Sequence, residues 1–460
     1  MQISNRFAQI SALAFGIAGA LAVGQAQASA FQLKENSVKA QGRAMAGSAS
    51  AKGDASVVVN NPAVMSTFTQ KAAQIDVSAI DLSFKFDGGG SAAAGTALAQ
   101  PLTGGNGGDA GALAAVPAMS FVLPLDGAFD RLTLGAMVSA PFGLKTDYDA
   151  DWVGRYHALE SDVKIIDLTL AASVAVTDRF SVGIGAIYER ADVTLSNGVD
   201  FGSAICRINL AACITPNPVA APFGPQKNDG TAKIEGSSNS LGWLVGLNWR
   251  PIDSLSLGYS HRSEIDHDLR GNATFEVPGN VKALLAIAAP NQYIDTPAGA
   301  ALTTPSVDTL SATWQATDRF ALMAEASKTD WHSLKEIRIQ FDSAQADSVE
   351  DYSWGDSWFY SVGGEYRFSD RFTFRAGVAR DDSPVSLPHR TPRMPDQDRM
   401  WYSVGLTWNA TPNFEVSASY TKVDMADTPK IDLVSSSGSR LVGEFDGGAD
   451  ILGVSAQYRF

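Results

Sequence analysis

A histidine and a serine two positions apart are the first residues in this chain that could do chemistry. His261 and Ser263 would share one face of a β-strand, because side chains alternate across a strand. A histidine beside a serine can activate the hydroxyl as a nucleophile, so one hypothesis is an esterase. An esterase also needs a group that orients the base and donors that bind the oxyanion, and no other enzymatic motif accompanies the pair. We therefore expect that the protein is not an enzyme.

Three arginines could bind an anionic ligand. Arg262, Arg375 and Arg399 lie on the polar side of segments in which apolar and polar residues alternate, and a guanidinium can hold a carboxylate by two hydrogen bonds. Glu325 also lies on a polar side, and ligand binding is one expectation for all four. The other expectation is that these charges pair with one another, because buried charges need partners. The polar-side charges are Glu189, Arg262, Glu264, Glu325, Glu365, Arg375, Asp381 and Arg399.

The two cysteines of the chain, Cys206 and Cys213, lie close together in a segment rich in alanine, proline and glycine. In an exported protein they would form one disulfide-closed loop. The remaining histidines are His157, His267, His332 and His389. Their spacing is not that of metal ligands, and the sequence has no Walker loop, GxGxxG fingerprint or HExxH motif. We expect no metal and no cofactor.

Composition limits the classes of protein in which these residues could act. The 460 residues are 45% hydrophobic and 18% charged, with a net charge of −14 and a mean hydropathy of −0.02. The acidic balance argues against nucleic acid as a partner, because phosphate binding needs clustered positive charge. Near-zero hydropathy fits either a soluble protein or a membrane barrel, whose strands alternate apolar and polar residues.

The first residues have the features of a secretory signal peptide. Arg6 is the only charge before an apolar run from Ile10 to Val23, and small residues follow the run. The run is too short to span a bilayer as a helix, and Ala26 and Ala28 fit a cleavage pattern. We predict a signal peptide over residues 1–28. No later stretch is apolar for the roughly 18 residues that a transmembrane helix needs.

A short turn recurs along the mature chain, each time between two alternating segments. The turns contain Asp130-Arg131, Asp178-Arg179, Asp318-Arg319 and Asp370-Arg371. The connections at the other ends of the segments are long, polar and rich in glycine and proline. Short turns at one end and long loops at the other are typical of an outer-membrane barrel.

The alternating segments number about 14, and bacterial single-chain barrels have an even number of strands. The segments begin near Ala72, Ala115, Leu132, Asp162, Phe180, Lys233, Leu255, Asp308, Phe320, Asp356, Phe372, Arg399, Asn413 and Asp450. We therefore predict an all-β fold, a transmembrane antiparallel β-barrel over residues 71–460 in the bacterial outer membrane. The last segment alternates to Phe460, and a terminal aromatic resembles the signal that barrel-assembly machinery reads. Both termini would then face the periplasm.

Residues 29–70 do not fit the barrel, because they are small and polar and show no alternation before Val57. By composition alone they could be a disordered leader. Three short motifs, Phe31-Gln32-Leu33, Gly42-Arg43-Ala44 and Asn61-Pro62-Ala63, resemble the N-terminal hatch of FadL-type long-chain fatty acid transporters. Further segments resemble that family in its order, namely Phe142-Gly143-Leu144, Arg262-Ser263-Glu264, Asp381-Asp382-Ser383-Pro384-Val385 and Pro395-Asp396-Gln397-Asp398-Arg399 with Trp401.

The resemblance implies a barrel whose lumen holds residues 29–70 as a hatch. It also implies passive uptake of long-chain fatty acids through an extracellular loop groove, a lumen site and a lateral opening near a kinked third strand. Pro141 would interrupt that strand, because proline lacks the N–H that a ladder needs. By the same resemblance, the hatch and the opening include Asn61, Pro62, Ala63, Ala114 and Ala140.

The loop groove would lie between residues 197–232 and 276–305. The second loop contains Leu284, Leu285 and Ile287 in an apolar stretch that favours a short helix, and an exposed apolar stretch often marks a binding surface. An equally good interpretation is that the helix packs on the cysteine-containing loop.

Other functions remain open at this point. Uptake of aromatic hydrocarbons or other small hydrophobic compounds is the nearest alternative, and a structural or adhesive barrel is an alternative of a different class. The expected surroundings are outer-membrane lipid and lipopolysaccharide, and we expect a monomer. Acidic residues gather in the outer loops, for example at Asp147, Asp149 and Asp151, which indicates a solvated surface.

Overall fold

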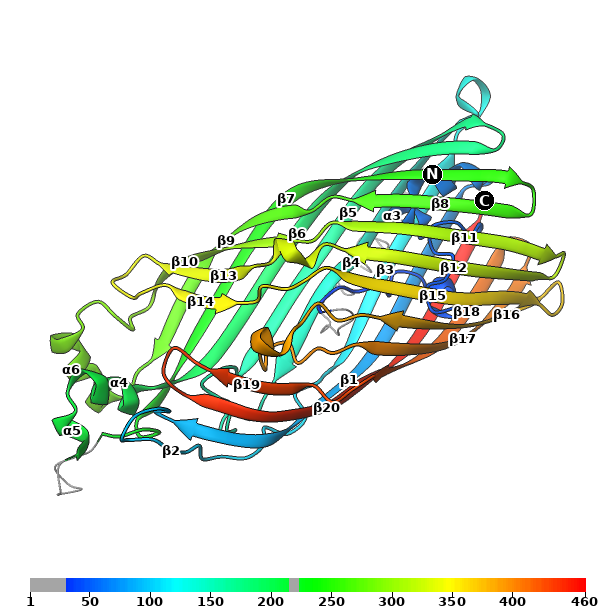
Figure 1. The fold of residues 1–460 in the computed structure, drawn as a ribbon. Helices are drawn as coiled ribbons and strands as arrows, with labels where there is room; N and C mark the ends of the chain where they lie inside the picture. Colours follow the sequence, from blue (N-terminus) through cyan, green and yellow to red (C-terminus); the bar gives the residue numbers. More distant parts are fainter. Residues whose placement is uncertain (1–29, 215–222) are drawn as a thin grey trace, which may run out of the picture.

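Antiparallel strands close into a barrel of 14 in this computed structural model. The structure describes residues 30–214 and 223–460, so the predicted signal peptide lies outside the described residues. The first and last strands, β1 and β20, pair from Ala72 and Arg459 to Ser91 and Arg440, which closes the ring (Figure 1). The prediction of an all-β transmembrane barrel is confirmed.

The barrel strands follow one another around the ring in chain order. They are β1 (Ala72–Ala92), β3 (Leu113–Pro124), β4 (Leu132–Asp147), β5 (Glu160–Thr177), β6 (Phe180–Asp200), β7 (Asp229–Ile252), β8 (Leu255–Arg262), β11 (Val307–Thr317), β12 (Phe320–Thr329), β15 (Ser357–Arg367), β16 (Phe372–Asp381), β17 (Arg399–Thr411), β18 (Phe414–Met425) and β20 (Arg440–Arg459). β20 begins at Arg440 rather than near Asp450, because Gly443, Gly447 and Gly448 hide its alternation.

The long-loop end carries further structure. β9 (Ile265–Glu276) and β10 (Thr296–Thr304) pair beyond β8 and β11. The smaller strands and helices at this end are β2 (Gln100–Pro101), β13 (Glu336–Phe341), β14 (Ser348–Asp351), β19 (Lys430–Val434), α4 (Phe201–Ile208), α5 (Ala211–Ile214), α6 (Gly279–Ala288), η3 (Trp331–Ser333) and η4 (Leu387–His389), whereas η2 (Gly127–Phe129) lies in the short turn between β3 and β4. Figure 1 shows α4, α5 and α6 together at this end. In the described part of the chain, no helix is both long enough and apolar enough to cross a membrane.

Four of the short turns share one hydrogen-bonding pattern. The Thr177 hydroxyl oxygen accepts from the backbone N–H groups of Arg179 and Phe180, at 3.2 and 3.0 Å. The turns that follow Thr317, Ser369 and Thr411 repeat the pattern. A hydroxyl that accepts from the N–H groups two and three residues later favours a tight turn, which explains the recurrence in the sequence.

The two faces of the strands differ as the alternation predicts. Ile184 and Leu241 point outward with 60% and 78% of their side chains exposed, whereas Glu189 and Asn248 point inward and are buried. An apolar outside suits lipid, and polar groups inside must find partners in the lumen.

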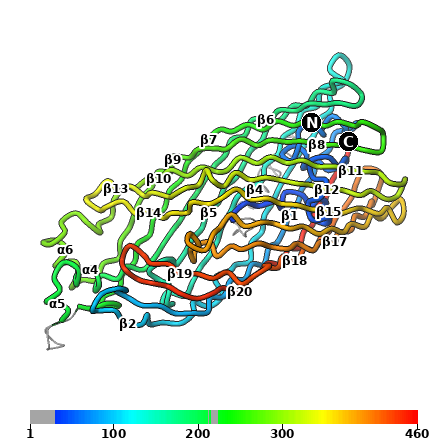
Figure 2. The backbone as a smooth tube through the Cα atoms, in the orientation of Figure 1, coloured from blue at the N-terminus to red at the C-terminus, as the bar shows by residue number. Residues whose placement is uncertain are grey.

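Residues 30–68 supply many of those partners. They form α2 (Val38–Gln41), α3 (Val57–Asn60) and η1 (Pro62–Thr67), and they lie within the ring of strands in Figure 2. Lys39 forms an ion pair with Glu415 of β18, and the hydroxyl and backbone N–H of Ser48 donate to Glu325 of β12 at 2.7 and 2.8 Å. The barrel wall therefore holds this segment from several sides.

Two glycines of the wall leave room for the N-terminal segment. A side chain at Gly377 of β16 would collide with the Arg43 carbonyl, and one at Gly246 of β7 would collide with the Asn61 side chain. Close backbone approach of this kind requires glycine.

Candidate functional site

The ladder between β3 and β4 is incomplete. The two strands pair only from Met119 and Val138 to Pro124 and Thr133, although β3 starts at Leu113 and β4 runs to Asp147. The register of β4 on β5 also shifts between Ser139 and Phe142, the interval that contains Pro141. The predicted interruption of the third strand is confirmed, and it leaves residues 113–118 of β3 without described partners on β4.

The inner side of this break is covered by the start of the N-terminal segment. Leu33 donates its backbone N–H to the Pro141 carbonyl at 2.7 Å, and Gly143 donates to the Phe31 carbonyl at 2.8 Å. Residues 31–33 thus add a short strand to β4 where its ladder to β3 is lost.

The residues expected at the lateral opening are distributed over two places. Ala114 and Ala140 lie on the two strands that flank the break and pack in the same apolar cluster. Asn61 lies elsewhere, because its side-chain amide donates to the Leu247 carbonyl of β7 at 2.9 Å. Pro62 and Ala63 lie against β6, where the Ser181 hydroxyl donates to the Ala63 carbonyl at 2.8 Å.

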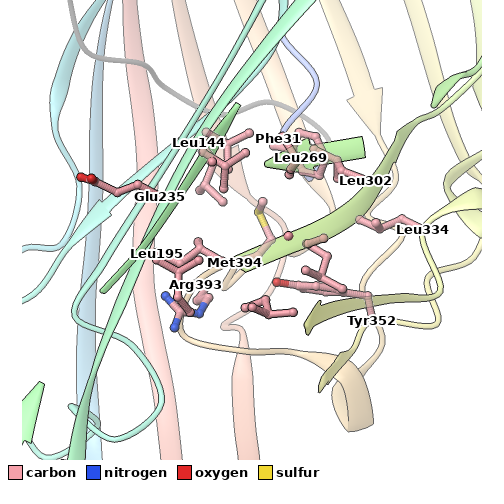
Figure 3. A pocket seen from close by; sticks show the side chains of 18 of the residues that line it. Phe31, Leu144, Leu195, Glu235, Leu269, Leu302, Leu334, Tyr352, Arg393 and Met394 are labelled. Atoms are coloured by element: carbon pink, nitrogen blue, oxygen red, sulfur yellow. The ribbon is translucent and has the colours of Figure 1, made fainter. Parts of the chain in front are cut away.

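An apolar cavity lies between this break and the long-loop end. Its volume is about 60 Å³, so it is a narrow space between apolar side chains. The apolar lining residues labelled in Figure 3 include Phe31, Leu144, Leu269, Leu302, Leu334 and Met394. The Phe31 ring packs edge-on against Trp331 at 4.8 Å between ring centroids, so the N-terminal segment forms part of the wall.

A second cavity lies on the other side of residues 31–33 and is more polar. Its volume is about 100 Å³, and its wall includes Leu33, Ser139, Phe142, Arg262 and Glu325. Residues 31–33 therefore lie between an apolar chamber and a polar chamber that reaches the break in β4.

The three arginines predicted to meet a ligand carboxylate all have carboxylate partners within the protein. Arg262 forms ion pairs with Asp167, at 3.0 Å, and with Glu189. Arg375 lies 2.9 Å from Glu365, and Arg399 lies 3.3 Å from both Asp381 and Asp396. Of the three, only Arg262 lines one of these two cavities.

Glu264 differs from its predicted orientation. Its side chain is exposed on the outside, because the chain is interrupted between β8 and β9 and Ile265, rather than Glu264, continues the inward side.

His261 and Ser263 take different partners. His261 Nδ1 lies 3.0 Å from Asp308, and its ring packs on Trp243. The Ser263 hydroxyl oxygen accepts from the Trp243 backbone N–H at 3.1 Å. These contacts do not assemble a nucleophile with its base.

One exposed group combines two carboxylates with a histidine. Side-chain atoms of Asp330, His332 and Asp356 lie within 4.8 Å of one another. Lys328 Nζ lies 2.6 and 2.9 Å from the two carboxylates. The lysine already balances their charge, so the group is an ion-pair cluster.

The two predicted loops meet at the long-loop end. Cys206 of α4 and Cys213 of α5 form a disulfide. Leu285 of α6 is buried among residues of α4, whereas Leu284 and Ile287 are 39% and 84% exposed. The predicted helix is confirmed, and it has one packed face and one open face.

Arg393 is a cavity residue that the sequence did not single out. It lines the apolar cavity beside Met394, on the connection between β16 and β17. Strand alternation could not identify it, since it lies on no strand. The sequence signal available was an arginine two residues before Pro395, where a family-like segment begins.

The comparison with protein families decides the assignment. A family model described as "Outer membrane protein transport protein (OMPP1/FadL/TodX)" matches residues 19–460. The chain belongs to this family. Members of the OMPP1/FadL/TodX family are outer-membrane transporters of hydrophobic compounds rather than enzymes.

Individual members of the OMPP1/FadL/TodX family are similar over most of their length. Outer membrane protein P1 of Haemophilus influenzae is 28% identical over 414 residues, 87% of each chain. A long-chain fatty acid transport protein of Escherichia coli O6:H1 is 26% identical, over 88% of this chain and 90% of its own.

Solved structures agree with this fold. The crystal structure of a FadL homologue from Pseudomonas aeruginosa has a TM-score of 0.84 and 27% identity, covering 94% of this chain and all 100% of its own. The Pseudomonas putida toluene transporter TodX has a TM-score of 0.66 at 14% identity, covering 94% and 99%, a likeness of fold alone.

Proposed function

We propose that this protein takes up long-chain fatty acids across the outer membrane by diffusion, without an energy source of its own. The observation that supports this most directly is the apolar cavity, whose wall includes Phe31, beside a second cavity that Gln32 and Leu33 line and that reaches the broken β3–β4 ladder. The similarity to long-chain fatty acid transport proteins supports the same substrate.

Capture would begin at the open face of α6. Leu284 and Ile287 expose apolar area beside the disulfide-closed loop, and such area attracts a poorly soluble acyl chain. The chain would next enter the apolar cavity, where it loses its contact with water. Residues 30–68 would act as a hatch that prevents open diffusion through the lumen.

Release would be lateral, through the gap between β3 and β4. Ala114 and Ala140 are small, and the strands beside them have no described ladder to break. A fatty acid that leaves here enters the membrane instead of the periplasm, which spares its tail from water.

The membrane arrangement is part of the same proposal. The long-loop end would face the outside, in contact with lipopolysaccharide, and both termini would face the periplasm. The barrel-assembly machinery would recognise Phe460. The Phe460 backbone N–H donates to the Lys71 carbonyl at 2.9 Å, which ties the last residue to the start of β1. We propose a monomer, because the hatch fills the lumen of a single barrel.

Uptake of small aromatic hydrocarbons is the second candidate. It is favoured by the rings around the apolar cavity, where Trp354 lies 5.3 Å from Trp331 and 6.1 Å from Phe31 between ring centroids.

Growth and uptake measurements separate the two candidates. A strain lacking the gene should grow poorly on oleate and normally on toluene, and plasmid-borne protein should restore uptake of labelled oleate. Normal oleate uptake by the deletion strain, with lost toluene uptake, would favour the second candidate. Loss of neither would contradict both and favour a structural barrel.

A further inference from the structure

Arg393 brings a positive charge to the wall of an otherwise apolar cavity. Its side chain is only 6% exposed, and it lies beside Leu195 and Met394 in Figure 3. The one other charged residue of the wall, Glu235, points away from the labelled cluster in Figure 3 and forms an ion pair with Lys233.

Most of the Arg393 guanidinium is held by the protein. Nε donates to Glu350 at 3.1 Å, and Nη1 donates to the carbonyls of Glu160 and Ser196 and to the Ser161 hydroxyl, at 3.1 to 3.2 Å. These bonds fix the orientation of a side chain that is otherwise flexible.

The remaining nitrogen, Nη2, has no hydrogen-bond partner within residues 30–214 and 223–460. The indole N–H of Trp354, on the same cavity wall, is fully buried and has no partner in that part of the chain. Buried donors nearly always have acceptors. The cavity therefore offers donors that a hydrocarbon cannot satisfy.

We propose that Arg393 Nη2 binds the carboxylate of an acyl-chain ligand and thereby selects fatty acids over neutral hydrophobic molecules. The acyl chain would lie along Leu144, Leu269 and Leu302, and the Trp354 N–H would be a second donor to the headgroup. This inference rests on the proposed function and names the residue that binds the carboxylate headgroup. None of Arg262, Arg375 and Arg399 lines the apolar cavity, whereas Arg393 does.

Glu350 provides a second test of the inference. Its carboxylate accepts from both Arg393 and the Tyr352 hydroxyl, and it is 32% exposed. A negative charge at this point opposes a bound carboxylate, so its removal should strengthen binding of an acid and leave binding of an ester unchanged.

The test compares oleate with methyl oleate on the purified mature protein, by competition against a fluorescent long-chain fatty acid. The wild type should bind the acid about 10-fold more tightly than the ester. Arg393→Gln should lose about 10-fold for the acid and nothing for the ester, and Arg393→Lys should lose less. Glu350→Gln should gain affinity for the acid alone. Arg380→Gln, at an exposed outer position, is the matched control and should change neither.

Four outcomes would contradict the proposal. Equal loss of both ligands in Arg393→Gln would make the residue structural. No gain in Glu350→Gln would also count against it. Equal binding of acid and ester by the wild type would overturn the headgroup role while leaving uptake of hydrophobic molecules intact. Binding of neither by the wild type would overturn the proposed function itself, and the inference with it.

Discussion

Leu33 donates its backbone N–H to the carbonyl of Pro141 at 2.7 Å, which joins the N-terminal segment to the point where β4 loses its partner β3. Proline leaves no N–H for the ladder, but its carbonyl still needs a donor, and Leu33 provides one. The same contact covers the inner side of the gap. Movement of residues 31–33 would therefore join the two cavities and uncover the break in one step.

The first prediction concerns the gap itself. Ala140→Arg should stop oleate uptake, because a long charged side chain would fill the space between β3 and β4. Ala140→Ser should retain uptake, since it keeps the size. Folding of both variants is checked by the shift in gel mobility on heating. Normal uptake by a folded Ala140→Arg protein would exclude lateral release at this point.

The second prediction concerns the glycines that receive the N-terminal segment. Gly377→Leu should destabilise the docked segment by about 1–3 kcal/mol, because the new side chain would collide with Arg43. Limited proteolysis should then cut within residues 30–68 faster than in the wild type. Gly89→Leu is the control, since a side chain there would meet no atom within 4 Å. Equal protection of both variants would show that the segment does not depend on this contact.

The barrel was predictable from the sequence because the alternation of apolar and polar residues can be seen within each strand alone. Each strand needs only alternate residues of opposite character, so Ile184 and Glu189 reveal their faces without knowledge of the rest of the fold. The rule failed at Ser263 and Glu264, where an interruption reverses the alternation, and at the start of β20, where glycines carry no signal.

The site was less predictable because its contacts join distant segments. Arg393 lines the cavity although it lies on a loop, and the Phe31 ring packs on Trp331, which is 300 residues later in the chain. Alternation placed Arg262 correctly in the lumen but gave no information on Asp167 as its partner. Which charged residues pair depends on the register between neighbouring strands, and that register cannot be read from a single sequence.

The third prediction separates structural from ligand-binding roles for Arg262. Arg262→Met should cost about 3–5 kcal/mol, because it leaves Asp167 and Glu189 buried without their cation. Adding Asp167→Asn and Glu189→Gln should restore much of that loss. Thermal unfolding of the single and triple variants measures both effects. A stable single variant that had lost fatty acid binding would instead make Arg262 a ligand residue.

The fourth prediction compares the two faces of α6. Ile287→Asp should raise the half-saturating oleate concentration by roughly 10-fold, because burying an isoleucine side chain contributes about 1.5–3 kcal/mol. Leu285→Ala should instead loosen the packing of α6 on α4 and increase proteolysis of the loop. Unchanged uptake kinetics in Ile287→Asp would show that the open face of α6 takes no part in capture.

The last prediction follows from a buried acid in the N-terminal segment. Burial raises the pKa of the Glu35 carboxyl from 4.5 to about 7, against smaller opposing effects of backbone hydrogen bonds and of the charges on Arg399 and Lys34. The folded chain therefore holds a proton that the unfolded chain releases near its ordinary pKa. The associated stability is fully present below pH 4.5 and is lost as the pH rises through 7.

A shift of this size corresponds to roughly 3 kcal/mol between low and high pH. Glu35→Gln removes the charge and keeps the shape, so it should unfold at a higher temperature than the wild type at pH 8. The two proteins should converge near pH 4. Glu336→Gln, at a side chain 44% exposed, is the control and should follow the wild type throughout. Parallel melting curves for wild type and Glu35→Gln across this range would show that Glu35 does not carry the buried proton.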